Sequence, residues 1–233
     1  MIVYTIYGVI KGGYNKMKTP KESKKDVGLH ITIEHGGKMD GMLSLSTNPL
    51  INSQCNKNCT IDGSICKDGP CFSRKQMERY PSMQKPLTKN YEILTTRILP
   101  VNELPLINAL YFRFEAFGDL ASVTQATNYL NIAKANPYAF FTIWTKNPKY
   151  IQAAIDWNGK PENLTVIYSS LFMNKPTKID VIRRKYPCID KVFTVYDEKA
   201  AQSVSVNCGA RKCLKCRICY EKNDITEVNE IVK

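Results

Sequence analysis

Short apolar runs recur along the middle of this chain at a nearly constant interval. They begin near Tyr111, Tyr138, Leu164 and Lys191, so successive starts lie 27, 26 and 27 residues apart. The segments between them have compositions typical of helices: 123–135, 148–157 and 178–186. Uninterrupted apolar strands that alternate with helices at this spacing predict βαβ units and a parallel sheet.

The first half of the chain adds further elements to this pattern. An apolar segment at 42–46 predicts another strand, and the segment 30–34 before it predicts a β hairpin closed by His35-Gly-Gly-Lys38. Helices are expected at 72–80 and 86–99, and residues 1–10 are also strand-like. The expected fold is therefore a single α/β domain over 1–233, with about five βα units in an open parallel sheet or a partial (β/α) barrel.

Polar residues follow several of the predicted strands. In parallel α/β sheets, ligands bind beyond the carboxyl ends of the strands, so these residues are expected to share one rim. They are Arg113, Glu115, Gly118, Asp119, Thr145, Lys146, Ser169, Ser170 and Asp197. Caps, turns and surface ion pairs explain most polar residues at such places, and Glu115 and Asp119 are the stronger functional candidates.

The net charge of the chain limits the classes of partner that it is expected to bind. Among 233 residues, 33 are Lys or Arg and 21 are Asp or Glu, a formal charge of +12, and 43% apolar residues argue against a disordered chain. The basic excess lies in a Lys-rich N-terminal segment, 1–26, and between Arg211 and Lys222. A solvated surface or a nucleic-acid footprint both explain it. Because no long apolar run is present, we expect a cytoplasmic protein with no membrane partner.

Nine cysteines are the strongest compositional signal, and their clustering without an export signal favours metal over disulfides. The C-terminal loop, 207–220, holds Cys208-x4-Cys213-x2-Cys216-x2-Cys219. Four thiolates suit a 4Fe-4S cluster or zinc, and three cysteines at two-residue spacing favour iron–sulfur, with zinc as the alternative. The neighbouring Arg211, Lys212, Lys215 and Arg217 would offset the negative charge of such a centre or contact a phosphate.

The first cysteine loop, 47–72, is looser and holds Cys55, Cys59, Cys66 and Cys71. Cys55-x3-Cys59 matches the opening of the three-cysteine loop of radical S-adenosylmethionine enzymes, but the next intervals differ. Three ligands would leave one iron open to substrate or cofactor, whereas four would close the site, and the two cysteine groups can hold one or two clusters. Cys188 is expected to be a lone buried thiol, and His30 and His35 ordinary hairpin residues.

Several motifs together resemble the phage "gene product eighty-eight" domain family over about residues 40–220. They are the segment from Met42 to Ile51, Asn52, Cys55, Cys66, Cys71-Phe-Ser73, Tyr80-Pro81, Asn90, the segment from Arg113 to Leu120, the segment from Phe141 to Lys146, and Cys208 to Tyr220. The family pattern is itself similar to a trimmed radical S-adenosylmethionine barrel, with cysteines after the first strand and a Gly-acid pair, here Gly118-Asp119, after the second.

The resemblance implies an iron–sulfur protein of a phage or mobile element, with a radical S-adenosylmethionine-like enzyme as the further hypothesis. In that hypothesis Cys55, Cys66 and Cys71 hold a cluster, with Cys59 as rival or fourth ligand, and an electron donor is a partner. Glu115 and Asp119 would contact the amino group or ribose of S-adenosylmethionine, beside Lys146 and Ser169. The alternatives are a metal-stabilised nucleic-acid-binding protein without catalysis and a purely structural zinc protein.

Overall fold

One mostly parallel sheet organises the protein. The computed structural model describes residues 26–69, 71–209 and 211–232, so the expected strand at 1–10 lies outside the described residues. The sheet has seven strands in the order β1-β2-β3-β4-β5-β6-β7. β1 pairs antiparallel with β2, which confirms the hairpin, and each later strand is parallel to the one before it. The strands are Thr32–Ile33, Leu43–Leu45, Tyr111–Phe114, Phe140–Thr145, Leu164–Ser169, Lys191–Tyr196 and Glu227–Ile231.

The helices connect these strands. They are α1 (Ser53–Asn58), α2 (Phe72–Arg79), α3 (Gln84–Thr96), α4 (Val123–Ala135), α5 (Pro148–Asn158), α6 (Ile179–Lys185), α7 (Glu198–Ala201) and α8 (Cys213–Cys216), with 3-10 turns η1 (Pro81–Met83) and η2 (Val101–Glu103). Ser122 begins α4 because its side chain accepts a hydrogen bond from the Gln125 backbone N–H. Asn147 occupies the N-cap position of α5, but its side chain makes no capping hydrogen bond.

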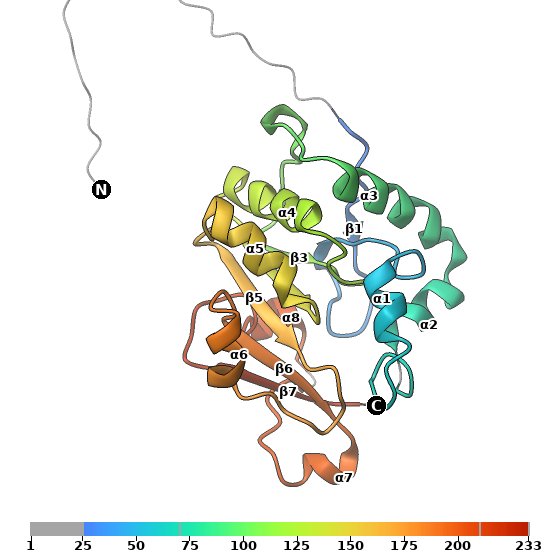
Figure 1. Cartoon of the computed structure of the whole chain (residues 1–233), viewed down its shortest axis with the longest axis vertical. Helices are drawn as coiled ribbons and strands as arrows, with labels where there is room; N and C mark the ends of the chain where they lie inside the picture. Colours follow the sequence, from blue (N-terminus) through green and yellow to red (C-terminus); the bar gives the residue numbers. More distant parts are fainter. Residues whose placement is uncertain (1–25, 70, 210, 233) are drawn as a thin grey trace, which may run out of the picture.

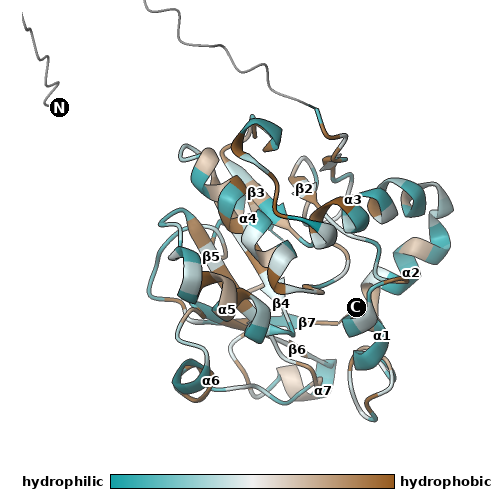
Figure 2. Ribbon diagram, turned by 45° about the horizontal axis from the view of Figure 1, so that its top comes forward, coloured by the Kyte–Doolittle hydropathy of each residue, from teal (hydrophilic) through white to brown (hydrophobic). Residues whose placement is uncertain are grey.

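The main core lies between the sheet and the helices that cover one of its faces. Phe112, Phe114 and Phe141 point to this face, and the Phe114 ring stacks on Tyr129 of α4 with centroids 4.3 Å apart. Figure 1 shows α4 and α5 in front of the strands, as expected when sequential parallel strands are joined by right-handed crossovers. Hydrophobic residues follow strands such as β5, whereas the outer sides of the helices are more hydrophilic (Figure 2).

The opposite face of the sheet is more polar and carries the C-terminal cysteine segment. The pairing register aligns Ser44, Arg113 and Thr142 on this face, because side chains alternate along each strand. A second apolar cluster of Met42, Tyr111 and Tyr220 forms there, with Cys213, Leu214 and Cys219 packed against it.

The observed sheet corresponds to the open parallel sheet of the two expected architectures. Six consecutive strands, β2 to β7, run parallel, and β7 extends the expected set of about five βα units. No pairing joins β1 to β7 among the described residues, so a closed barrel is not observed. Side chains nevertheless link the two ends of the sheet, because Lys38 of the hairpin loop forms an ion pair with Glu230 of β7.

Candidate functional site

The first cysteine loop runs across the carboxyl ends of the strands. It leaves β2, and its far end reaches the segment after β5, where the Ile65 N–H donates to the Leu171 carbonyl oxygen at 2.9 Å. Ser64 also forms a β-bridge with Phe172. Cys55 lies in α1, Cys59 at its C-cap, Cys66 in the following turn and Cys71 at the N-cap of α2. The four cysteines of this loop, which we term the rim group, therefore lie where parallel sheets bind ligands.

Asn52 fixes the start of the rim group. Its side-chain oxygen accepts hydrogen bonds from the backbone N–H groups of Gln54 and Cys55, at 2.9 and 3.2 Å, which caps α1. Its Nδ2 donates to the Asp119 carbonyl oxygen at 2.6 Å, so α1 is tied to the segment after β3. Asn52 is fully buried. One buried amide thus holds Cys55 beside the Gly118-Asp119 pair.

The thiols of the rim group influence one another electrostatically. Burial raises the pKa of Cys66 to about 11, the positive charge of Lys146 acts in the opposite direction, and Cys71 and Cys59 raise the pKa further. Burial also raises the pKa of Cys55 far above its ordinary value, with Asp119 and Glu115 adding to the effect. Without a metal, burial therefore keeps Cys55 and Cys66 in their protonated form.

Glu115 is buried at this rim, and its carboxylate accepts hydrogen bonds from other groups of the protein. Its carboxylate accepts hydrogen bonds from the Thr47 N–H at 3.2 Å, from the Thr47 hydroxyl, from Gln125 Nε2 at 2.6 Å and from the Tyr129 hydroxyl. Its backbone has a positive φ of 53°. Burial raises the pKa of Glu115 to about 8, although the hydrogen bonds from Tyr129 and Thr47 act in the opposite direction.

Asp119 is held in the same way. It accepts from the Leu120 N–H at 2.7 Å, the Thr145 hydroxyl at 2.6 Å, the Lys146 N–H at 2.9 Å and Asn147 Nδ2 at 3.1 Å. Four donors on each carboxylate use its ordinary accepting capacity. The cofactor-binding role expected of Glu115 and Asp119 stays a prediction, and a ligand at either carboxylate would have to displace an internal donor.

Lys146 and Ser169, the other expected pocket residues, are hydrogen-bonded to each other. Lys146 Nζ donates to the Ser169 hydroxyl at 2.6 Å. The charge of Lys146 also acts on Cys66, so its ammonium group lies near the rim group. The structure therefore brings the rim cysteines, Asp119 and Lys146 together at one end of the sheet.

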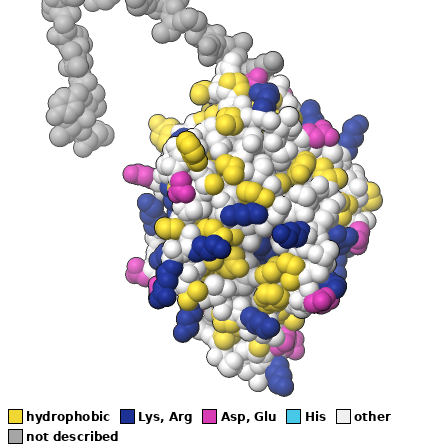
Figure 3. Space-filling model, viewed as in Figure 1, with side chains coloured by type: hydrophobic (Ala, Val, Ile, Leu, Met, Phe, Trp, Pro, Cys, Tyr) yellow, Lys and Arg dark blue, Asp and Glu magenta, His cyan; other side chains and the backbone are white. Residues whose placement is uncertain are grey.

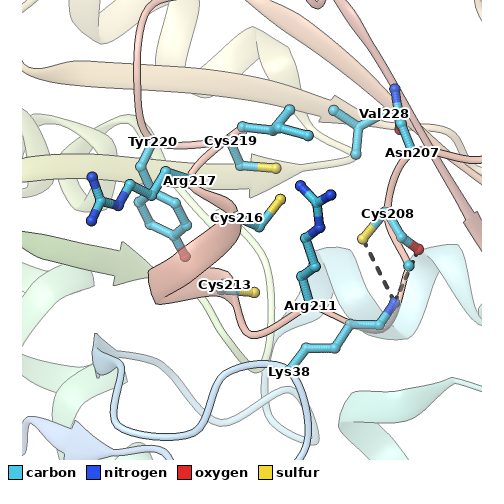
Figure 4. A pocket seen from close by; sticks show the side chains of 12 residues that line it. Lys38, Asn207, Cys208, Arg211, Cys213, Cys216, Arg217, Cys219, Tyr220 and Val228 are labelled. Carbon is cyan, nitrogen blue, oxygen red and sulfur yellow. Dashed lines mark hydrogen bonds between the residues drawn. The ribbon is translucent and has the colours of Figure 1, made fainter.

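The C-terminal cysteines form a separate group on the open face of the sheet. Cys208, Cys213, Cys216 and Cys219 all line one cavity of about 30 Å³, together with Lys38, Arg211 and Tyr220. Figure 4 shows the Arg211 side chain extending toward the space between Cys208 and the other three cysteines.

Backbone and side-chain contacts hold this C-terminal group against the sheet. The Cys213 N–H donates to the Lys38 carbonyl oxygen at 2.7 Å, and the Thr142 hydroxyl donates to the Cys219 carbonyl oxygen at 3.0 Å. Lys38 Nζ lies 3.6 Å from Cys208 Sγ. Burial raises the pKa of Cys208 to about 11 and that of Cys219 to about 12.

The donor chemistry of the C-terminal group fits a tetrathiolate centre, because its cavity is lined by four thiols and no carboxylate. As the side chains stand, no group of three or more His, Cys, Asp or Glu residues is arranged to hold a metal ion, within 26–69, 71–209 and 211–232. Metal binding at either group therefore requires the sulfurs to move together. At the C-terminal group, Arg211 would have to leave the space between them.

Arg113 does not lie at the rim, where it was expected. It lies inside β3 on the open face, where its guanidinium stacks 3.9 Å above the Trp144 ring, near the C-terminal group. The alternation in Tyr-Phe-Arg-Phe contained the signal, because Arg113 must point away from the core that Phe112 and Phe114 enter. The positions of Arg113 and Tyr220 near the C-terminal cysteines were not predicted from the sequence.

The basic residues around the C-terminal group are exposed: Arg211, Lys212, Lys215 and Arg217. Lys212 pairs with Asp40 at 3.0 Å, and Arg217 lies 3.6 Å from Glu221. The opposite, helix-covered face, seen in Figure 3, also exposes Lys and Arg side chains across its middle, with hydrophobic side chains between them. Cys188 is buried as expected, at 5% exposure, and burial raises its pKa to about 12.

Fold and site together define a cysteine-rich α/β protein with one thiol group at the carboxyl rim of a mostly parallel sheet and a second on its open face. The family model described as Gene product 88 matches residues 9–227, so the chain belongs to this phage-associated family. No curated protein and no solved structure matches it. Among the helices that the structure describes, none is long and apolar enough to span a bilayer.

Proposed function

We propose that this protein is an iron–sulfur protein with two cysteine centres, of which the C-terminal one stabilises the sheet and the rim one carries the chemistry. The observation that carries the proposal is the gathering of Cys208, Cys213, Cys216 and Cys219 around one cavity. The rim group lies elsewhere, at the carboxyl ends of the strands, which supports two centres rather than one shared cluster.

The C-terminal centre has a structural role in this proposal. Cys208 forms a β-bridge beside Glu230 of β7, and Cys213 is bonded to Lys38 of the hairpin loop. A cluster held by the four thiolates would join segments from the first and last parts of the sheet. Since ligands must gather for the metal to bind, its binding energy adds to the stability of the folded state.

The choice of metal rests on spacing. Cys213, Cys216 and Cys219 follow at two-residue intervals on α8 and the turn after it, which supports an iron–sulfur cluster. Zinc, which also accepts four thiolates in tetrahedral geometry, is the alternative metal.

The rim centre would be held by Cys55, Cys66 and Cys71, with Cys59 as the rival or fourth ligand. When bound, a reduced cluster with one open iron supplies the electron that cleaves S-adenosylmethionine in radical enzymes. Lys146 is a cation close to this group, as is Arg74 beside Cys59, and the Lys146 ammonium can bind a carboxylate of such a cofactor. Glu115 and Asp119, with their internal donors, would hold the loops in place.

Anaerobic purification, followed by reconstitution with iron and sulfide, tests the proposal. We expect visible charge-transfer absorbance together with iron and acid-labile sulfide in amounts for two centres. Bound zinc without labile sulfide would overturn the iron–sulfur assignment, and a metal-free chain would overturn both metals.

Single substitutions then assign the centres. Cys216→Ser should lose the iron of one centre and lower the stability of the protein, whereas Cys66→Ser should lose the iron of the other with a smaller effect on unfolding. Cys188→Ser, outside both groups, is the matched control and should keep all iron. Full iron retention by Cys59→Ser would support a three-ligand rim site, and loss in that variant would support a closed one.

The exposed Lys and Arg side chains of Figure 3 support the alternative function, a metal-stabilised nucleic-acid-binding protein. Binding to nucleic acid should then weaken steeply with salt, because neutralised phosphates release counterions. Absence of binding at low salt would exclude this alternative.

A further inference from the structure

Two buried polar atoms stand out beside the C-terminal cysteine group. Within the part of the chain that the structure describes, Arg113 Nε and the Tyr220 hydroxyl are the buried side-chain atoms without a hydrogen-bond partner. Most buried polar groups in proteins are paired, so each exception asks for an explanation. Both exceptions here adjoin one site, since Tyr220 lines the cysteine cavity and the two side chains that contact Arg113, Met39 and Trp144, pack against the cluster that contains Tyr220.

Among the described residues, no carboxylate forms an ion pair with Arg113. Its guanidinium stacks on the Trp144 ring at 3.9 Å, and Nη1 lies 3.0 Å from the Met39 sulfur. Glu34 is close enough for the charge of Arg113 to lower its pKa, but its carboxylate accepts from the Ser44 hydroxyl at 2.6 Å and burial raises the pKa overall. A partly buried guanidinium without a paired anion is costly.

The C-terminal thiols are the groups that can supply the missing negative charge. Met39 and Trp144, the two side chains that Arg113 contacts, pack together with Cys213 and Cys219 against one apolar cluster. Arg113 therefore lies beside two of the four cysteines, and metal binding would give their sulfurs negative charge, because the thiolate is the form that binds metal.

We propose that Arg113, in addition to Lys38 beside Cys208, is a charge-compensating residue of the C-terminal metal centre, with its unpaired Nε–H available to the sulfur ligands. The inference rests on the proposed function, because it requires a metal–thiolate centre at Cys208–Cys219. The four basic residues near those cysteines in sequence are exposed and screened by solvent, whereas Arg113 is half-buried. A charge in this environment acts on the centre more strongly than an exposed one.

Measurements on the reconstituted full chain test this role. Wild type is compared with Arg113→Met, which removes the charge, Arg113→Lys, which retains it, and Arg184→Met, which removes an exposed charge from α6. Metal affinity is measured by chelator competition, and the midpoint potential by spectroelectrochemistry if the centre is iron–sulfur. Folding of each variant is checked by circular dichroism.

We expect Arg113→Met to bind metal about tenfold more weakly than wild type, because one favourable charge interaction is lost. Reduction adds negative charge to the cluster, so the loss of Arg113 should weaken binding of the reduced cluster more than that of the oxidised cluster. A tenfold difference between the two losses corresponds to a fall of about 59 mV in the one-electron potential. Arg113→Lys should retain most of the affinity and the potential, and Arg184→Met should match wild type.

The failures are distinguishable. A metal-free wild type would overturn the proposed function, and with it this role. Metal-replete wild type together with unchanged affinity and potential in Arg113→Met would overturn the role of Arg113 alone. Equal losses in Arg113→Lys and Arg113→Met would show that shape rather than charge matters and would also overturn it. If Arg113→Met does not fold, Arg113→Gln replaces it as the neutral variant under the same criteria.

Discussion

Glu115 makes the stability of this protein depend on pH in a direction opposite to that of most carboxylates. The side chain is 2% exposed, and burial raises its pKa from 4.5 to about 8. As pH rises through the pKa of the unfolded chain, the unfolded state loses this proton while the folded state keeps it. The folded state then binds more protons, so the free energy of unfolding falls until the pH passes about 8.

The magnitude follows from the size of the shift. Each pKa unit corresponds to 1.36 kcal/mol, so the change from 4.5 to about 8 is worth roughly 5 kcal/mol between those pH values. In Glu115→Gln the side chain is neutral at every pH, so this decrease in the free energy of unfolding should be absent. At acid pH this variant should be less stable than wild type by about 1–3 kcal/mol, because its amide group faces the donors Thr47 and Gln125. The gap should close or reverse toward pH 8.

Urea unfolding of the metal-free, reduced protein, followed by circular dichroism at several pH values, measures this effect. Glu78→Gln, the same change at an exposed position on α2, is the matched control and should follow the wild-type curve. Parallel pH curves for wild type and Glu115→Gln would refute the argument, because they would show that Glu115 titrates alike in the folded and unfolded states.

Three further predictions concern the same rim and the lone cysteine. Gly118 has φ +88° and an added Cβ would lie 2.9 Å from the Thr47 carbonyl oxygen, so Gly118→Ala should destabilise by about 2–4 kcal/mol in urea unfolding, and Gly159→Ala, with open space at φ +71°, by only about 1 kcal/mol. Asp119→Asn replaces an acceptor of four hydrogen bonds, and a loss of about 2–4 kcal/mol is expected; an unchanged urea midpoint would contradict it. Cys188→Ser buries a hydroxyl in a core site and should cost about 1–3 kcal/mol while the metal content by elemental analysis stays constant.

Much of the secondary structure could be predicted because it depends on neighbouring residues. Apolar runs predicted β3 to β6 close to their observed starts, and α4 occupies the expected Val123–Ala135. The strand β7, Glu227–Ile231, was not predicted because its sequence, Glu-Val-Asn-Glu-Ile, has few apolar residues. Its pairing with β6 comes from backbone hydrogen bonds, for which the sequence offers no strong pattern.

The candidate site was partly predictable for the same reason. Cysteine spacing indicated two thiol groups, and the βα pattern placed the rim group at the carboxyl ends of the strands, beside Asp119 and Lys146. Spacing along the chain cannot show which donors a buried carboxylate meets. Glu115 accepts hydrogen bonds from Thr47 and Tyr129, and Asp119 accepts one from Thr145. These donors reach the carboxylates only because β2, β3, β4 and α4 converge there.

The position of the C-terminal group was decided by tertiary structure alone. Local sequence specified four cysteines on a short basic loop, but their position on the open face depends on contacts such as Cys213 with Lys38 and Cys219 with Thr142. Those partners are far apart in sequence and meet only after the sheet has formed. The same folding places Arg113 on the face that carries the thiols, because alternation along β3 sends Phe112 and Phe114 into the core and leaves the arginine on the other face.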